Sequence, residues 1–271
     1  MTSLGAAYSA GASAWASGPA PMYERLAGLL VKFSPVPLGG RLVLDLGSGT
    51  GAGSRAALSI GARVIGADLA LGMLLSGRHD RPPAAVGNAL ALPFGRDAFD
   101  VVLAPFSLNH LDDPAAGVRE AGRIGGHLVA STYAADDDHP AKVAVETALS
   151  ELGWRRPAWY EALKSAMAAW GTVEGTVAVL ERGGMRPLAV EPRAVEFPDL
   201  VPGDLVAWRM GMPHSAGFVE TLDPDARRSV FGRALELLGA DPVPLVRRVI
   251  FLAAAAVSSS HVQGARLPSA G

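Results

Sequence analysis

The stretch RLVLDLGSGTGAGSRAALSIGARVIGAD, residues 41–68, decides the fold of this chain. Its apolar run at residues 42–44 ends in an acid and a glycine-rich loop, which is typical of a buried parallel strand that runs into a tight turn. Residues 54–60 then predict a helix, and residues 63–68 predict a second strand that ends in Asp68. The unit is β-α-β, so we expect a ligand beyond the carboxyl ends of its strands.

Two classes of ligand use such a unit, and the charge of one side chain separates them. Gly47, Gly49 and Ala52 satisfy the dinucleotide fingerprint G-x-G-x-x-G/A, and Asp68 lies near the place of its ribose-binding acid. Asp45 would repel a pyrophosphate, however, and would attract a cation. S-adenosylmethionine has a sulfonium, an ammonium and no phosphate, so it suits this pattern better than NAD. An NAD-linked oxidoreductase, or a non-methylating ligand-binding protein on the same nucleotide fold, remains the alternative.

Further motifs follow in a fixed order along residues 38–133. They are LDLGSGTG at residues 44–51, DLALGML at residues 68–74, GNALALPF at residues 87–94, and FDVV followed by SLNHLDDP within residues 99–114. Together they resemble the motifs of class I S-adenosylmethionine-dependent methyltransferases, in particular the small-molecule group that includes the ubiquinone and menaquinone C-methylases. One departure is Asn88, where the family usually has an aspartate that accepts a hydrogen bond from the adenine amino group. The amide oxygen of Asn88 can still accept, so we expect weaker cofactor binding.

This resemblance implies a methyltransferase that uses S-adenosyl-L-methionine as its cofactor. The implied fold is α/β and Rossmann-like: a seven-stranded, mostly parallel sheet whose last strand is antiparallel, with helices on both faces. The implied cofactor-binding residues are Asp45, Gly47, Ser48, Gly49, Gly51, Asp68, Leu69, Met73, Asn88, Ala89, Leu90, Ala104 and Pro105. Met73 is as well explained by ordinary packing in the core as by contact with the adenine of the cofactor.

The pattern along the chain divides it into five segments. Residues 1–34 predict an N-terminal lid and a helix, although a frayed tail explains the first 21 residues equally well. Residues 35–134, in which strands and helices alternate, predict the cofactor-binding core. Residues 135–184 predict a helical cap over the substrate, as in the resembled group. Residues 185–260 predict the last strands of the sheet with a helical insertion, and residues 261–271 a disordered tail.

Composition excludes several kinds of protein. The 271 residues have a formal net charge of −2 with scattered Lys and Arg, which argues against a nucleic-acid partner. Cysteine is absent, which excludes disulfides and is consistent with a cytoplasmic protein. Residues 1–21 do not resemble a secretory signal, and the longest apolar run, residues 249–257, is too short to cross a membrane. Asp136 and His139 lack further ligands at metal-binding spacing, so we expect no metal.

Methyl transfer requires an acceptor held in line with the methyl group and, for some acceptors, a base. The candidate bases are His110, which follows the fourth predicted strand, Tyr133, and His214 in a predicted loop at residues 210–215. Residues 104–107 do not match the N-P-P-Y motif, which argues against methylation of exocyclic amines or of glutamine.

The predicted cap is rich in aromatic and cationic side chains, which favours a largely apolar acceptor with an anionic head. The candidate substrate-binding residues are Tyr8, Trp15, Phe106, Trp154, Arg155, Arg156, Trp159 and Trp208, with Lys142 and Arg209 as further cations. We expect Arg155 or Arg156 to line the cavity; the alternative is that both are solvated. One acceptor that fits is an isoprenoid such as a prenyl diphosphate, and another is an aromatic or enolic natural product methylated on carbon or oxygen. The sequence specifies neither the acceptor nor whether the protein is a monomer or a homodimer.

Overall fold

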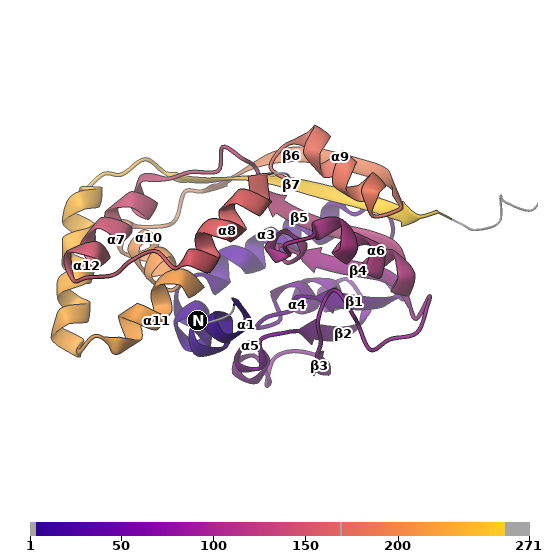
Figure 1. Cartoon of the computed structure of the whole chain (residues 1–271), viewed down its shortest axis with the longest axis horizontal. Helices are drawn as coiled ribbons and strands as arrows, with labels where there is room; N and C mark the ends of the chain where they lie inside the picture. Colours follow the sequence, from indigo (N-terminus) through magenta and orange to yellow (C-terminus); the bar gives the residue numbers. More distant parts are fainter. Residues whose placement is uncertain (1–3, 169, 258–271) are drawn as a thin grey trace, which may run out of the picture.

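A seven-stranded sheet runs through the computed structural model, which describes residues 4–168 and 170–257 (Figure 1). The strand order is β3-β2-β1-β4-β5-β7-β6. The parallel part consists of β1 (Leu42–Leu46), β2 (Arg63–Asp68), β3 (Ala84–Val86), β4 (Phe99–Pro105) and β5 (Gly125–Tyr133). The last strand, β7 (Leu245–Ala256), inserts antiparallel between β5 and β6 (Met185–Phe197). The predicted fold, including its antiparallel last strand, is confirmed.

Both faces of the sheet are covered by helices. Successive residues of each central strand point to opposite faces, so they pack in two separate cores. Val43, Val101 and Val129 pack in one core with α3 (Ala20–Phe33) and α4 (Ala52–Ser59). Their neighbours Leu44, Val102 and Leu128 pack in the other core with α6 (Pro114–Ile124) and α9 (Val173–Arg182). A parallel sheet requires helical crossovers of this kind, so apolar runs rather than alternating patterns mark its strands.

The remaining helices gather around one end of the sheet (Figure 1). They are α1 (Leu4–Ala10), α2 (Ala12–Ser17), α5 (Leu71–Ser76), α7 (Pro140–Glu151), α8 (Ala158–Ala168), α10 (Pro202–Met210), α11 (Pro213–Thr221) and α12 (Pro224–Leu238). Several of them start with proline, which is favoured in the first turn because it has no N–H to leave without a partner. None of the helices in the described ranges could span a membrane.

Two predictions about local structure need correction or completion. Residues 210–215 are not a loop: α10 ends at Met210 and α11 begins at Pro213, so His214 lies in a helical turn. The described part of the N-terminal segment is helical rather than frayed, because Ala12 and Trp15 pack with Ala70 and Met73. The predicted tail at residues 261–271 lies outside the described residues.

Candidate functional site

The glycine-rich loop after β1 has a backbone that other residues adopt only at a cost. Gly47, Gly49 and Gly51 have φ values of +71°, +52° and +98°. A Cβ at Gly47 would lie 2.3 Å from the Cβ of Ser107, whose hydroxyl donates to the carbonyl of Leu46 at 2.7 Å. The loop therefore packs directly against the turn after β4, and its missing side chains leave the backbone open to a ligand.

Asp68, the last residue of β2, stabilises this loop. Its carboxylate accepts the N–H of Gly49 at 2.7 Å and the N–H of Ala70 at 2.7 Å. Burial raises the pKa of Asp68 above its usual value, and these two hydrogen bonds oppose that rise. Each carboxylate oxygen has a further lone pair, so Asp68 retains the capacity to accept hydrogen bonds from a ligand.

Asp45 is fully buried near the end of β1. The hydroxyl of Ser54 donates to its Oδ2 at 2.6 Å, whereas Oδ1 has no hydrogen-bond partner among the described residues. Burial raises the pKa of Asp45 to about 6. A buried carboxylate oxygen without a donor is unfavourable, and a cationic ligand would relieve the cost. The site therefore fits the ammonium group of S-adenosylmethionine.

These residues line a cavity of about 170 Å³ over the carboxyl ends of β1, β2 and β4, which we call the cofactor cavity. Its described lining has two carboxylates and no lysine or arginine. Of the predicted cofactor-binding residues, the cavity brings together Asp45, Gly47, Ser48, Gly49, Asp68, Leu69, Met73, Asn88, Ala89 and Pro105. Gly51, Leu90 and Ala104 do not line it: Gly51 caps α4, Leu90 is exposed, and Ala104 is buried inside β4.

Asn88 has a local role as well as a place in the wall. Its side-chain oxygen accepts the N–H of Leu90 at 2.9 Å, which closes the turn after β3. The oxygen predicted to accept from the adenine amino group is therefore already bonded once. Because an amide oxygen has two lone pairs, this bond does not exclude the predicted contact.

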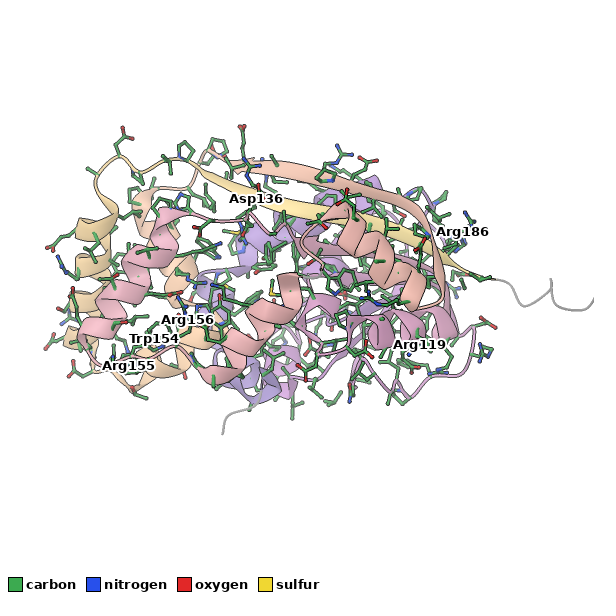
Figure 2. The ribbon with its side chains drawn as sticks, turned by 45° about the horizontal axis from the view of Figure 1, so that its top comes forward. Arg119, Asp136, Trp154, Arg155, Arg156 and Arg186 are labelled. Carbon is green, nitrogen blue, oxygen red and sulfur yellow. The ribbon has the colours of Figure 1, made fainter. Side chains whose placement is uncertain are left out.

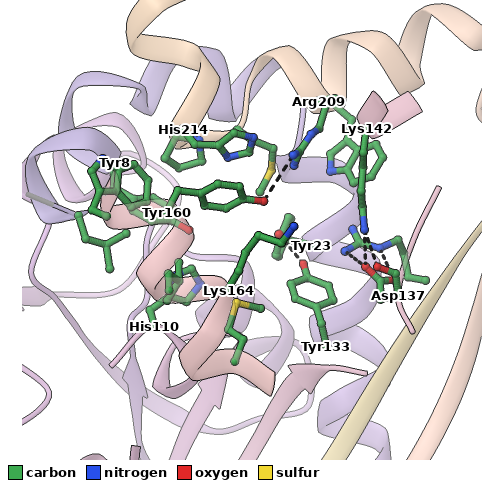
Figure 3. Close-up of a pocket in the computed structure, with 18 of the residues that line it drawn as sticks. Tyr8, Tyr23, His110, Tyr133, Asp137, Lys142, Tyr160, Lys164, Arg209 and His214 are labelled. Carbon is green, nitrogen blue, oxygen red and sulfur yellow. Dashed lines mark hydrogen bonds and ion pairs between the residues drawn. The ribbon is translucent and has the colours of Figure 1, made fainter. Parts of the chain in front are cut away.

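A second cavity, of about 220 Å³, adjoins the first, and we call it the acceptor cavity (Figure 3). Leu4, Tyr8, Tyr23 and His110 line both cavities and form the wall between them. The rest of the described lining includes Tyr133, Asp137, Lys142, Trp159, Tyr160, Lys164, Trp208, Arg209, His214 and Arg247. Leu4 and Tyr8 lie on α1, which is joined to α5 because the N–H of Gly72 donates to the Ser9 hydroxyl at 3.2 Å.

A buried ion pair closes one side of the acceptor cavity (Figure 3). Arg247 donates to both oxygens of Asp137, at 3.0 and 2.9 Å, and Lys142 lies 3.2 Å from the same carboxylate. The guanidinium of Arg247 also lies 4.3 Å from the centre of the Tyr133 ring. Burial works to raise the pKa of Asp137, but the two cations overcome it and hold that pKa below its usual value.

A second group of polar side chains lies on another side of this cavity. Arg209 is 4% exposed, forms an ion pair with Glu146 and lies 3.4 Å from the hydroxyl of Tyr160. The Tyr160 ring stacks on the imidazole of His214, with centroids 4.1 Å apart and planes 10° apart. The ammonium of Lys164, from α8, reaches the same space (Figure 3).

All three candidate bases line the acceptor cavity. Burial lowers the pKa of His110 to about 4, and burial together with nearby cations lowers that of His214 well below its usual value, so both imidazoles are neutral. Burial raises the pKa of Tyr133 well above 10, and its hydroxyl donates to the hydroxyl of Tyr23. Of the three, His110 alone lines both cavities.

The predicted substrate-binding residues divide into two groups. Tyr8 and Trp15 line the cofactor cavity, Tyr8 also lines the acceptor cavity, and Trp159 and Trp208 line the acceptor cavity. Phe106 and Trp154 line neither. Phe106 lies behind Tyr133 with ring centroids 4.6 Å apart, and the indole N–H of Trp154 donates to the carbonyl of His214 at 3.2 Å.

Arg155 and Arg156 also line neither cavity; they lie on the segment between α7 and α8 (Figure 2). The expectation that one of them faces the acceptor therefore needs correction. Arg156 pairs with Glu146 and, at 2.7 Å, with Glu161, and Arg155 is exposed. Carboxylates on the two flanking helices thus hold Arg156 outside the cavity.

Sequence reasoning did not identify Tyr23, Tyr160, Lys164 or Arg247. Arg247 carried the clearest signal, because a cation on the buried face of an otherwise apolar strand requires a buried partner. That partner, Asp137, belongs to the acidic stretch considered for metal binding. There, Asp136 pairs with Arg248 at 3.2 Å instead.

Comparison with known proteins gives matches of three kinds. A family model described as a methyltransferase domain matches residues 44–130. A demethylmenaquinone methyltransferase of Corynebacterium kroppenstedtii is 31% identical over 164 residues, or 55% of this chain and 70% of that relative. Its counterpart in Mycobacterium tuberculosis is 32% identical over 145 residues, or 48% of this chain and 60% of the relative. This chain therefore matches less than two thirds of the mycobacterial protein.

A solved structure from Anabaena variabilis, described as a methyltransferase of an antibiotic biosynthesis pathway, superposes with a TM-score of 0.57. It is 17% identical in sequence, and the match covers 84% of this chain and 96% of that one. At this identity the likeness concerns the fold alone. The family match at residues 44–130 contains the loops of the cofactor cavity, whereas most of the acceptor cavity lies outside it.

Proposed function

The chain belongs to the class I S-adenosylmethionine-dependent methyltransferases of the quinone C-methylase type, and we propose that its acceptor is a small hydroxylated aromatic ring, methylated at a ring carbon or at the hydroxyl oxygen. Methylation of a small molecule follows from the family; the aromatic acceptor is our inference. The observation that carries it is the acceptor cavity, where tyrosines and tryptophans supply flat apolar walls and cations lie among them. The relatives named demethylmenaquinone methyltransferases also support a quinone-like ring.

The cofactor supplies an electrophilic methyl group on a sulfonium, and the residues of this chain hold the reactants around it. Asp45 provides a carboxylate for the ammonium group, and Asp68 provides one for the ribose hydroxyls. His110 and Tyr23, on the shared wall, face the position of the reacting ring. The Tyr133 hydroxyl donates a hydrogen bond to the Tyr23 oxygen, so the Tyr23 hydroxyl is left free to donate its own hydrogen bond to the acceptor.

His110 is the group we assign to proton removal. Its imidazole is neutral at pH 7 and has a lone pair to accept the proton of the acceptor hydroxyl. Loss of that proton makes the ring electron-rich, and a bond forms from carbon or oxygen to the methyl group as the bond from sulfur to that methyl breaks. For carbon methylation, the proton of the methylated ring carbon then passes to solvent while the His110 imidazolium returns its proton to the ring oxygen, which restores the aromatic hydroxyl. A hydrogen bond from the Tyr23 hydroxyl, on the same wall as His110, stabilises the negative charge on the ring oxygen.

The alternatives from the sequence fit less well. A prenyl diphosphate carries several negative charges, whereas Arg247 and Lys142 are already paired with Asp137 and the charge of Arg209 is partly balanced by Glu146, which Arg209 shares with Arg156. An NAD-linked oxidoreductase would place a pyrophosphate beside Asp45 and Asp68, in a cavity whose described lining has no cation. Both observations favour a methyl donor and a singly charged or neutral ring.

Incubation with methyl-labelled S-adenosylmethionine tests the proposal. We expect label to enter a naphthoquinol or a hydroxynaphthalene. We also expect His110→Gln to lower kcat far more than it changes cofactor affinity. The control is His79→Gln, because His79 is exposed and lines neither cavity. Label in a prenyl diphosphate but in no aromatic ring would contradict the proposal. Tight binding of NAD without binding of S-adenosylhomocysteine in calorimetry would contradict the family's cofactor use.

A further inference from the structure

We propose that the acceptor carries a carboxylate and that Trp208, Arg209 and Lys164 bind it at the side of the acceptor cavity remote from the methyl donor. This inference rests on the proposed function and adds the chemical group that selects among aromatic rings. It also fixes how the acceptor lies in its cavity.

Besides Nδ1 of His110 on the shared wall, three buried nitrogen atoms on the wall of this cavity have no hydrogen-bond partner among the described residues. They are Nε1 of Trp208, Nε of Arg209 and Nε2 of His214, and these residues are 2%, 4% and 4% exposed. The indole and guanidinium nitrogens can only donate. A buried donor without an acceptor is unfavourable, so a ligand that supplies acceptor oxygens here is favoured.

The charge of the same wall selects an anion. The described lining contains Lys142, Lys164, Arg209 and Arg247 against one carboxylate, that of Asp137. Arg247 and Lys142 bind that carboxylate, as described above. Lys164, in contrast, has no carboxylate within 4.0 Å in the described part of the chain, and Arg209 shares the Glu146 carboxylate with Arg156. Lys164 and Arg209 therefore carry the positive charge left for a ligand.

One guanidinium, one ammonium and one indole N–H suit a single planar carboxylate. A carboxylate offers two oxygens in one plane, which match the N–H groups of an arginine and a neighbouring donor. A diphosphate would bring more negative charge than these two cations can balance, because the other cations of the wall, Arg247 and Lys142, are already paired with Asp137 and Asp138. The group that best satisfies this donor set is a carboxylate.

The position of this donor set orients the acceptor. Figure 3 shows Arg209 and His110 on opposite sides of the cavity, with Tyr160 between them. His110 lies on the wall shared with the cofactor cavity. A ring with its carboxylate at Arg209 therefore points its far edge at the methyl donor, and a hydroxyl on that edge reaches His110.

Calorimetric titration of the protein saturated with S-adenosylhomocysteine tests this inference. The probes are a hydroxynaphthoate, the naphthol that lacks its carboxylate, and the corresponding naphthyl phosphate. We expect the hydroxynaphthoate to bind at least about tenfold more tightly than the naphthol, the lower bound for a hydrogen bond to a charged group. Trp208→Phe and Lys164→Met should each lower that ratio by about fivefold or more without weakening the naphthol. Arg209→Gln should lower it further.

The matched control is Arg155→Met, which removes a cation close to the cavity but not on its wall. It should leave the ratio unchanged. Equal affinity for hydroxynaphthoate and naphthol, a ratio that survives Trp208→Phe and Lys164→Met, or tighter binding of the phosphate would each overturn the carboxylate assignment. If no aromatic probe binds although S-adenosylhomocysteine does, the proposed aromatic acceptor is wrong and this inference is wrong with it. Trp208→Phe and Lys164→Met keep the test valid if Arg209→Gln fails to fold.

Discussion

The cofactor cavity and the acceptor cavity meet at His110 and have opposite charge. The cofactor cavity has the carboxylates of Asp45 and Asp68 and no cation in its described lining, whereas the acceptor cavity has four cations and one carboxylate. The unpartnered buried atoms differ in the same way: Oδ1 of Asp45 needs a donor, and Nε1 of Trp208 needs an acceptor. Opposite charge would sort the cationic cofactor from the proposed anionic acceptor, because each cavity disfavours a ligand of the charge that suits the other.

The largest effect is expected from a substitution that distorts the cofactor cavity and leaves the acceptor cavity unchanged. Gly47→Ala places a Cβ 2.3 Å from the Cβ of Ser107 at a φ of +71°. The loop must move, and we expect affinity for S-adenosylhomocysteine to fall by more than about 100-fold, from strain of 1–3 kcal/mol plus the steric overlap. The control is Gly61→Ala, with φ of +81° and nothing within 4 Å of the new Cβ. Calorimetry with a thermal melt separates lost binding from unfolding; intact binding would show that the loop tolerates the shift.

The next largest effect is expected from a substitution that removes one carboxylate from the same cavity. Asp68→Ala should weaken S-adenosylhomocysteine by about 1.5–3 kcal/mol, the range for hydrogen bonds to a charged group. The loop also loses its bond from the Gly49 N–H to this carboxylate. Affinity for the aromatic acceptor should change little, and exposed Asp112→Ala serves as the control. Unchanged cofactor affinity in calorimetry would refute the assignment of Asp68 to the ribose.

A pH titration sharpens the comparison at Asp45. Burial raises the pKa of this carboxyl to about 6, so it becomes protonated as the pH falls below 6 and can no longer attract an ammonium group. We expect the affinity of S-adenosylhomocysteine to fall by up to about tenfold for each pH unit below 6, the limit for one proton. Asp45→Asn should bind more weakly at pH 7.5 and lose this pH dependence. A steep dependence that persists in Asp45→Asn would assign it to another group.

The smallest expected effect concerns a cation outside the acceptor cavity. Arg156→Ala removes partly exposed ion pairs with Glu146 and Glu161, which contribute about 0.2–1 kcal/mol. We therefore expect KM for the acceptor to change by less than about fivefold. Steady-state kinetics should show a much larger change for Arg209→Gln. If Arg156→Ala raised KM as much as Arg209→Gln, acceptor binding would depend on the charge of the surrounding surface rather than on the side chains that line the cavity.

The two cavities also differ in how far the sequence predicts them. Asp45 and Asp68 lie at strand ends and the glycine loop follows one, all in a local β-α-β unit, so chain order alone places them at one edge of a parallel sheet. The same reason applies to Asn88, which comes just after β3, and to Pro105, the last residue of β4. The parallel part of the Rossmann-like fold was predictable from the alternation of strands and helices, whereas its antiparallel last strand was implied by the family resemblance.

The acceptor cavity depends on contacts between distant parts of the chain. Arg247 reaches Asp137 across 110 residues, because β7 inserts beside β5. No spacing in the sequence indicates which of the four cations Lys142, Arg155, Arg156 and Arg209 faces inward. Glu146 separates two of these cations. Its carboxylate pairs with Arg156, which lies outside the acceptor cavity, and with Arg209, which lines it. Pairing of this kind depends on tertiary packing and cannot be inferred from periodicity.

The shared wall has a kinetic consequence. Leu4 and Tyr8 belong to both cavities, and α1, which carries them, is joined to α5 on the cofactor side through Ser9 and Gly72. A displacement of α1 would remove part of both walls at once, so one opening event would admit or release both ligands. The spent cofactor and the methylated product would then leave with a common rate constant, and a substitution that weakens the contact between α1 and α5, such as Ser9→Ala, would speed both departures together.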